Sequence, residues 1–293
     1  MNNTSHASHE TLATTRTGGS NMDLSPAQVE TFQRDGFLVI EGAFSPPEVA
    51  VLQAALPEIT DPSRGRVGFD EASGMVRLSH GAHLYHETIR RLSLHPRLVR
   101  PAQRLLNTEF HVYQSRLTIK PGLGSHSTGT AVQASGWVWH QDFSTWHRSD
   151  GMPESSVLVT FTFLDDVTAA NAPLLVIPRS HHQGLIGTFD CLVEGGDGNT
   201  YQDMAIPPDT LRELARQGGV VALTGPVGSV AFMHCALVHS SAQNISPLRR
   251  ALFTLVFNPI DNRPQHPRAG GRASAGMAPI RPLADDCLLT VAI

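Results

Sequence analysis

The chain has 293 residues, a formal net charge of −4 and a pI near 6.4. This length suits one large domain with its own core. The lack of a basic excess argues against nucleic acid or an anionic membrane surface as a partner. No run of roughly eighteen apolar residues predicts a membrane span. The first residues lack a signal-peptide pattern and the three cysteines are far apart, so we expect a cytoplasmic protein without a disulfide framework.

The sequence predicts one domain behind a polar tail. Residues 1–22 carry few bulky apolar side chains and are expected to be disordered, which leaves residues 23–293 as a single domain. Residues 184–218 combine Gly-rich and polar parts with a short helix near 209–217, as in an insertion or lid. Residues 262–282 are rich in Pro, Gly, Ala and Arg and are expected to lie irregularly over the sheet.

Two helices are expected before the main sheet. Ser25 is followed by proline and, three positions later, by Gln28, which is the pattern of a capped helix start. Gly36 is expected to end this helix. Residues 37–40 then predict a short buried strand, and Ser45 begins the second helix.

Short strands dominate the rest of the chain. They are predicted at residues 110–119, 136–140, 157–164, 174–177, 228–239 and 250–258. Many short strands with long connections, without regular alternation of strands and helices, are typical of an antiparallel double sheet. The predicted fold class is therefore mainly β with flanking helices, of the jelly-roll type.

The densest chemical pattern is the pair His140 and Asp142, with His239 on a distant predicted strand. Residues i and i+2 of a strand share a face, so both side chains of the pair are expected to point into the sheet's interior. Two neutral imidazoles and one carboxylate on one face of Fe(II) leave three positions open, which suits a bidentate 2-oxo acid plus dioxygen. The pattern indicates an iron-dependent oxygenase.

Other histidines near these segments are expected not to be ligands. They are His147, His181, His182 and His234. His234 precedes His239 by five residues on the same predicted strand, so it should face the opposite side as a core or supporting histidine. His181 and His182 follow the end of the strand predicted at residues 174–177, where surface or lid roles are common.

A 2-oxoglutarate site needs a buried cation for the distal carboxylate. Arg250 begins the strand after His239, so a hairpin would bring its guanidinium back beside the metal, and the planar fork suits a carboxylate. Arg249 should face solvent, although a register slip of one residue would exchange the two roles. Lys120, at the end of the strand from residue 110, is a second cation that could reach the cosubstrate.

These motifs resemble the phytanoyl-CoA dioxygenase superfamily, and within it the ectoine hydroxylases and the leucine hydroxylases of peptide natural-product pathways. The matching blocks are Gln114-Ser115-Arg116 with Lys120-Pro121, Trp139-His140-Gln141-Asp142-Phe143 with Thr145-Trp146-His147 and Asp150-Gly151-Met152-Pro153, Pro173-Leu174, Ile177-Pro178-Arg179-Ser180-His181, and His239-Ser240-Ser241 with Asn244-Ile245-Ser246-Pro247 and Arg250. The similarity covers residues 24–258, and the ordered set of blocks is highly specific.

The resemblance implies a double-stranded β-helix, or cupin-like jelly roll, with iron held by His140, Asp142 and His239. The candidate cofactor-binding residues are Lys120, Arg250, Thr118 and Ser241, and the candidate substrate-binding residues are Gln114, Arg116, Trp146 and Leu252. Within this set, the resemblance places Lys120 and Arg250 on 2-oxoglutarate and matches Gln114 and Trp146 to positions that touch ectoine. Trp146 is expected to form part of the pocket wall.

The substrate expectation comes from differences within the family. Thr118 stands where the ectoine enzymes have asparagine, and Leu252 stands where they place another asparagine against the substrate. The sequence around Phe232 and Trp139 is more similar to that of the amino-acid hydroxylases, so we expect the substrate to be a free amino acid or a derivative of one. Its carboxylate could be held by Arg116, or by one of Arg263, Arg268, Arg272 and Arg281.

The predicted activity is Fe(II)- and 2-oxoglutarate-dependent hydroxylation, with O2, of an unactivated C–H bond in a small polar metabolite, with natural-product biosynthesis as one setting. Asp142 argues against a halogenase, because halogenating relatives have a small residue at that ligand position. A desaturase or epoxidase with the same iron site, an ectoine hydroxylase and a non-catalytic jelly-roll binding protein are the alternatives. The oligomeric state is left open, with a homodimer among the options.

Overall fold

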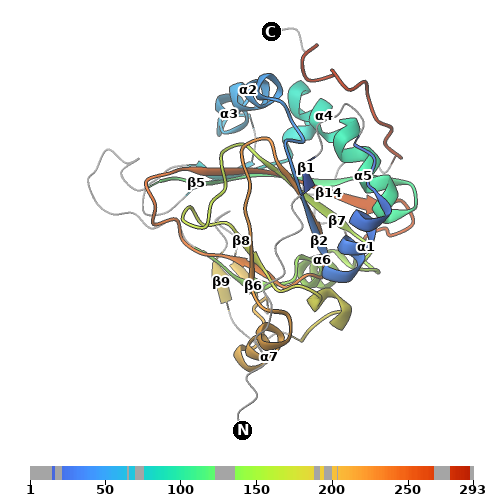
Figure 1. Ribbon diagram of the computed structural model, residues 1–293. Helices are drawn as coiled ribbons and strands as arrows, with labels where there is room; N and C mark the ends of the chain where they lie inside the picture. The colour runs from blue at the N-terminus through green and yellow to red at the C-terminus, as the bar shows by residue number, and fades with distance from the viewer. Residues whose placement is uncertain are drawn as a thin grey trace.

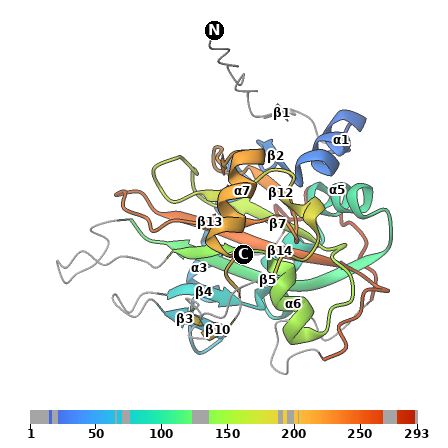
Figure 2. The ribbon, with the colours of Figure 1, turned by 90° about the horizontal axis from the view of Figure 1, so that it is seen from below.

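Two β-sheets face each other in the computed structural model, with a hydrophobic core between them (Figures 1 and 2). The structure describes residues 15–16, 22–64, 66–69, 76–122, 136–187, 192–194, 200–202, 204–266 and 278–290. Within these residues, no helix is both long and apolar enough to cross a membrane.

The larger sheet has eight strands, and all neighbours pair antiparallel except the parallel edge pair β1 and β2. Their spatial order is β1 (Thr15–Arg16), β2 (Phe37–Glu41), β12 (Val230–His234), β7 (Leu158–Phe163), β14 (Arg250–Pro259), β5 (Phe110–Lys120), β4 (Val76–His80) and β3 (Arg66–Phe69). The smaller sheet has four strands, in the order β11 (Val221–Leu223), β8 (Leu174–Val176), β13 (His239–Ser241) and β6 (Trp137–His140). A separate hairpin joins β9 (Leu192–Glu194) to β10 (Thr200–Gln202).

The helices lie mainly against the outer face of the larger sheet (Figure 1). They are α1 (Pro26–Asp35), α2 (Pro46–Ala54), α3 (Leu56–Ile59), α4 (Glu87–Ser93), α5 (Pro96–Leu106), α6 (Asp142–Asp150) and α7 (Pro208–Gly218), with short 3-10 turns η1 (Ala82–Leu84) and η2 (Ser180–Gln183). Side chains of α1 to α5 pack with Phe253 and Phe257 of β14 in one core, whereas Leu252 and Val256 of the same strand belong to a second core between the sheets. This alternation is the expected two-residue period of a strand buried on both faces.

The predicted helix starts are confirmed. Ser25 accepts a hydrogen bond from Gln28 N at 3.3 Å, while the Gln28 side chain accepts one from Ser25 N at 2.8 Å, which completes the capping box. Gly36 ends α1 with a left-handed φ of 83°, and a Cβ there would meet His181 Nδ1 at 2.5 Å. Glycine is therefore needed at this position for both conformation and space.

Two local predictions are wrong. The strand expected at residues 228–239 is two strands, because the chain leaves the larger sheet after His234 and enters the smaller one at His239. Asp142 does not lie on a strand with His140, since β6 ends at His140 and Asp142 is the first residue of α6. Helices α4, α5 and α6 and strands β3 and β4 were not anticipated from the sequence.

The terminal and insertion regions are described only in part. Within the predicted tail, Thr15 and Arg16 pair with β2 and Met22 is buried, and the other residues of that stretch lie outside the described ones. The helix predicted near 209–217 is α7. Cys235 and Cys287 are free and buried, whereas Cys191 lies outside the described residues.

Candidate metal centre and substrate cavity

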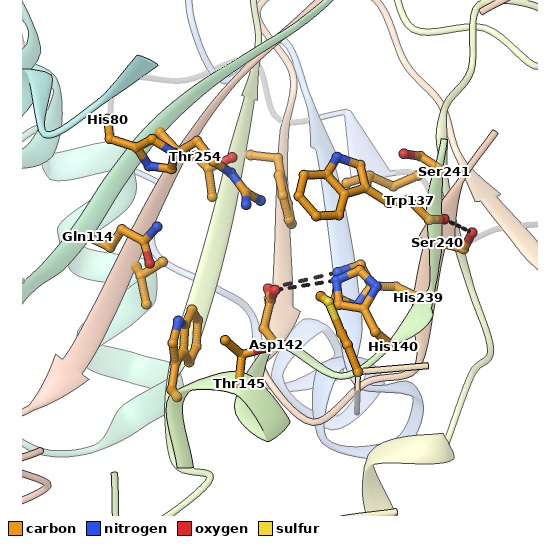
Figure 3. Close-up of a pocket in the computed structure, with 16 residues that line it drawn as sticks. His80, Gln114, Trp137, His140, Asp142, Thr145, His239, Ser240, Ser241 and Thr254 are labelled. Atoms are coloured by element: carbon orange, nitrogen blue, oxygen red, sulfur yellow. Dashed lines mark hydrogen bonds and ion pairs between the residues drawn. The ribbon is translucent and has the colours of Figure 1, made fainter. Parts of the chain in front are cut away.

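Three side chains converge at one end of the space between the two sheets (Figure 3). His140 ends β6 and His239 begins β13, and the two residues are direct partners in the antiparallel pairing of these strands. Asp142 Oδ1 lies 3.6 Å from His140 Nε2, and its Oδ2 lies 3.8 Å from His239 Nε2. One potential ligand atom from each residue lies within 4.8 Å of the other two. Among the described residues, this is the one group of His, Cys, Asp or Glu with such spacing.

The hydrogen bonds of the two imidazoles fix which nitrogen faces the centre. His140 Nδ1 lies 2.6 Å from Val138 O, and His239 Nδ1 lies 3.0 Å from Leu237 O. A carbonyl oxygen only accepts, so each Nδ1 carries the proton and donates it. Each Nε2 therefore presents a lone pair toward Asp142, which is the orientation that a metal ligand needs.

The protonation states at the centre suit a divalent metal. Burial lowers the pKa of His239 to about 4, so this imidazole is neutral at pH 7. Burial acts to raise the pKa of Asp142, but the His239 and His140 rings and Arg116 outweigh it and hold the pKa well below its usual range. Two imidazoles with one carboxylate match the facial set of a non-haem Fe(II) oxygenase. The residues present therefore fit iron.

The triad opens into a main cavity between the sheets, which encloses about 730 Å³ including space open to solvent. Its lining contains the predicted residues Gln114, Arg116, Trp146 and Ser241 together with His80, Trp137, Thr145, Phe161, Leu174, Met204, Ser240, Thr254 and Val256. Trp146 of α6 is held edge-on by Tyr113, with ring centroids 5.7 Å apart, and Tyr113 donates a 2.6 Å hydrogen bond to Asp150. Aromatic and aliphatic side chains line this cavity together with polar and charged groups around the triad, as in a small-molecule site.

A smaller inner cavity of about 260 Å³ adjoins the main one. It is lined by Thr118, Ser241, Arg250 and Leu252, and it shares Arg116, Trp137, Phe161, Leu174 and Thr254 with the main cavity. Leu252 and Thr118 are direct partners across β14 and β5. The two positions that differ from the ectoine enzymes thus lie beside Arg250, and not beside Gln114 and Trp146.

The two predicted cosubstrate cations are both buried. Arg250 is 1% exposed and donates from Nε and Nη2 to Ala172 O at 3.0 and 2.8 Å. Its neighbour Arg249 points outward to Asp165, as the alternation of the strand predicted. Lys120, which pairs with Arg250 across the strands, donates to Ser241 Oγ at 2.8 Å and to Ala242 O. Lys120 therefore reaches the cavities through Ser241.

Repulsion among these cations lowers their pKa values. Burial, then Arg250 and Arg77, lower the pKa of Lys120 to about 6. Burial, then Arg77 and Arg116, lower the pKa of Arg250 to about 9. An anion bound in the inner cavity would relieve this repulsion, so the region is built to receive negative charge.

The other histidine and arginine candidates are placed elsewhere, as far as the structure describes them. His234 lies beside His181, with ring centroids 5.1 Å apart, and its Nδ1 accepts from Ala236 N. His182 and His181 bond backbone carbonyls of α1, and His147 bonds Met152 O. Arg263 donates to Ile260 O and Arg281 pairs with Glu109, whereas Arg268 and Arg272 lie outside the described residues.

Several lining residues were not predicted from the sequence. Thr254 and Val256 lie two and four positions beyond Leu252 on β14, so strand alternation from Arg250 would have found them. His80 and Met204 come from β4 and from the connection before α7, and no local pattern links these segments to the centre.

The fold and this site define a family of non-haem dioxygenases. Residues 32–252 match the phytanoyl-CoA dioxygenase (PhyH) family, and the chain belongs to that family.

Two proteins of named activity and one crystal structure are similar to this chain over most of its length. The chain is 36% identical over 257 residues to an ectoine dioxygenase of Bordetella parapertussis, covering 84% of this chain and 79% of the relative. It is 33% identical over 267 residues to the L-proline trans-4-hydroxylase of Streptomyces griseoviridis, covering 88% and 95%. A crystal structure of EctD from S. alaskensis with 2-oxoglutarate and 5-hydroxyectoine superimposes with a TM-score of 0.74 at 34% identity, covering 89% of this chain and 87% of that one.

Proposed function

We propose that the protein is an Fe(II)- and 2-oxoglutarate-dependent dioxygenase that hydroxylates a small carboxylate-bearing metabolite of the amino-acid type. The observation that carries this proposal is the His140, Asp142 and His239 group in the lining of the main cavity, which shares part of its wall with an inner cavity that Arg116 and Arg250 line. In this assignment, iron is held by the triad, 2-oxoglutarate lies in the inner cavity, and the substrate lies in the main cavity.

The cosubstrate roles follow from charge and burial. Arg250 would take the distal carboxylate of 2-oxoglutarate, because Nε and Nη2 hold Ala172 O while Nη1 makes no hydrogen bond to the residues that the structure describes. Thr118 and Ser241 supply hydroxyl groups in the inner cavity, and Lys120 holds Ser241 in place from behind. Iron bound at the triad supplies the oxidising chemistry, in which 2-oxoglutarate and O2 yield succinate, carbon dioxide and a hydroxylated substrate carbon. The surrounding side chains position one C–H bond and exclude water.

The substrate proposal rests on Arg116. Its guanidinium lies 5.7 Å from the Trp137 ring centre, and its Nε is buried without a hydrogen-bond partner in the described part of the chain. A cation so placed in a cavity wall calls for an anion, and a carboxylate matches its geometry. Gln114, on the same face of β5 as Arg116 (Figure 3), and Trp146, in the same cavity lining, would orient the rest of the substrate.

Ectoine and cyclic or acyclic amino acids both satisfy this description. The relatives named ectoine dioxygenase and L-proline trans-4-hydroxylase support a small substrate with a carboxylate. Thr118 and Leu252 lie in the inner cavity, so their difference from the ectoine enzymes weighs less against ectoine than the sequence indicated. Leu252, predicted to contact substrate, is proposed instead to pack against the cosubstrate. Cytoplasmic location and a homodimer stay predictions from the sequence.

The test is succinate formation by the Fe(II)-loaded chain with O2 and 2-oxoglutarate, across free amino acids and ectoine, with product masses recorded. A substrate-dependent rise and a gain of one oxygen atom support hydroxylation, and His140→Ala should abolish both. A loss of two hydrogens would instead identify a desaturase. No stimulation by any compound, together with no binding of 2-oxoglutarate, would leave the non-catalytic binding protein as the better description.

A further inference from the structure

Gln141 lies between the two ligand candidates His140 and Asp142, but its side chain is not part of either cavity lining. It is fully buried at 0% exposure. Its Nε2 donates to Ala236 O at 2.6 Å and to Gly184 O at 2.8 Å, and its Oε1 accepts from Ile186 N at 2.9 Å. Both amide hydrogens and one oxygen lone pair are therefore bonded, all to backbone groups.

The bond to Ala236 joins the two segments that carry the ligands. Ala236 belongs to the connection between β12 and β13, which reaches His239 three residues later. A second bond in the same place runs from Phe143 N to Cys235 O at 3.1 Å. The turn that carries Asp142 is thus tied on both sides of that residue to the segment that leads to His239.

The bonds to Gly184 and Ile186 join the same turn to the chain that follows η2. Gln141 presents one donor and one acceptor to alternate residues, as a neighbouring strand would. At the far end of this connection, Ile206 N donates to Trp139 O at 2.9 Å, two residues after the cavity-lining Met204. Among the described residues of this connection, Gly184 and Ile186 at its start bond the turn after β6, and Ile206 at its end bonds β6 itself.

We propose that Gln141 is a positioning residue that sets the separation of Asp142 from His239 and couples the metal centre to the segment that follows η2, at Gly184 and Ile186. The proposal rests on the proposed function, since it assumes that the triad binds iron. Ligand orientation depends on such supporting hydrogen bonds, and their removal typically weakens metal binding by about ten- to a hundredfold. An apolar residue here would leave three backbone groups without their partner.

The first test compares Gln141→Leu with Gln53→Leu. Gln53 Nε2 also donates to a backbone carbonyl, Leu164 O, at 2.7 Å, but on α2 and away from the cavities. Anaerobic calorimetry should show Fe(II) dissociation constants about ten- to a hundredfold higher for Gln141→Leu and unchanged for Gln53→Leu. The ratio of hydroxylated product to succinate should fall in the first variant only. A folded Gln141→Leu with wild-type Fe(II) affinity and product ratio would overturn the proposal.

Two further measurements keep the proposal testable if Gln141→Leu does not fold. Gln141→Glu keeps the size and the acceptor for Ile186 N but sets a carboxylate oxygen against Ala236 O and Gly184 O, and it should weaken Fe(II) binding in the same range. In the wild-type chain, Fe(II) should slow hydrogen exchange at the Ile186 amide. An exchange rate at Ile186 that Fe(II) does not change would contradict the coupling. If the wild-type chain binds no Fe(II) at all, it is the proposed function that fails.

Discussion

Lys120 is the only lysine of the chain, and it is fully buried beside Arg250. Burial and the repulsion of Arg250 and Arg77 lower its pKa to about 6, well below the 10.5 of an ordinary lysine. At pH 7.5 the amine should therefore be about 3% protonated in the free protein. When 2-oxoglutarate brings negative charge to the inner cavity, the protonated amine becomes favourable again. Binding of 2-oxoglutarate should then take up close to one proton at this pH.

The lowered pKa of Lys120 also changes the free energy of unfolding. A lysine with a lowered pKa binds fewer protons in the folded than in the unfolded state between pH 6 and 10.5. The free energy of unfolding therefore rises with pH across this window: Lys120 carries no penalty above pH 10.5, and its penalty grows as the pH falls to 6. At pH 7.5 the unfavourable contribution is about 4 kcal/mol, since three pKa units separate this pH from the unfolded value. Lys120→Met should therefore be at least as stable as the wild-type chain at pH 7.5, despite the lost bonds to Ser241 and Ala242.

A single lysine makes the assay direct. Protein grown with lysine labelled with ¹³C at Cε gives one folded-state lysine resonance, whose pH titration reports Lys120 alone. The midpoint should lie near 6 in the free protein and move up by about 2.5 units or more when 2-oxoglutarate and Zn(II), in place of iron, are added, because uptake of close to one proton at pH 7.5 requires a shift of that size. Calorimetry in buffers of different ionisation enthalpy should show the proton uptake, and Lys120→Met should abolish it. A midpoint near 10.5 in the free protein would refute the reasoning.

Three other changes test separate parts of the structure. Arg250→Met should weaken 2-oxoglutarate binding by about 2 to 5 kcal/mol in calorimetric titrations, because it removes one partner of a buried charge pair. Arg249→Met should bind 2-oxoglutarate as the wild-type chain does, because it loses only an outward ion pair with Asp165. Burial acts to raise the pKa of Glu48, but hydrogen bonds from His95, Ser45 and Arg97 lower it to about 2. The wild-type free energy of unfolding should therefore fall by about 3 kcal/mol between pH 4.5 and 2, measured by denaturant titration, and Glu48→Gln should lack this fall. The same pH dependence in Glu48→Gln would contradict the assignment. Tyr113→Phe removes the buried bond to Asp150 and should lower the free energy of unfolding by about 1 to 3 kcal/mol, measured in urea.

Strand alternation explains why much of the site was predictable. The inward direction of Arg250 and the outward direction of Arg249 follow from the two-residue period of β14, and Gln114, Arg116 and Thr118 share one face of β5 for the same reason. The helix cap at Ser25 likewise depends on a residue only three positions away. These features depend on residues a few positions apart, which the sequence displays.

The errors have a different physical origin. The sequence pattern at His140 and Asp142 is the same whether the chain continues as a strand or turns into a helix, and the bonds that hold this turn come from Ala236 and Gly184, far away in the sequence. The break between His234 and His239 follows from a change of sheet, which apolar runs do not reveal. The placements of Met204 and His80 likewise depend on how distant segments pack.

The most direct test of the central claim is the anaerobic addition of 2-oxoglutarate to the Fe(II)-loaded chain, followed by visible absorption. Bidentate binding of a 2-oxo acid to Fe(II) gives a metal-to-ligand charge-transfer band. We expect this band for the wild-type chain and for Arg249→Met, its loss in Asp142→Asn, and a strongly weakened titration in Arg250→Met. A folded, Fe(II)-loaded wild-type chain without the band at saturating 2-oxoglutarate would contradict the assignment of His140, Asp142, His239 and the inner cavity.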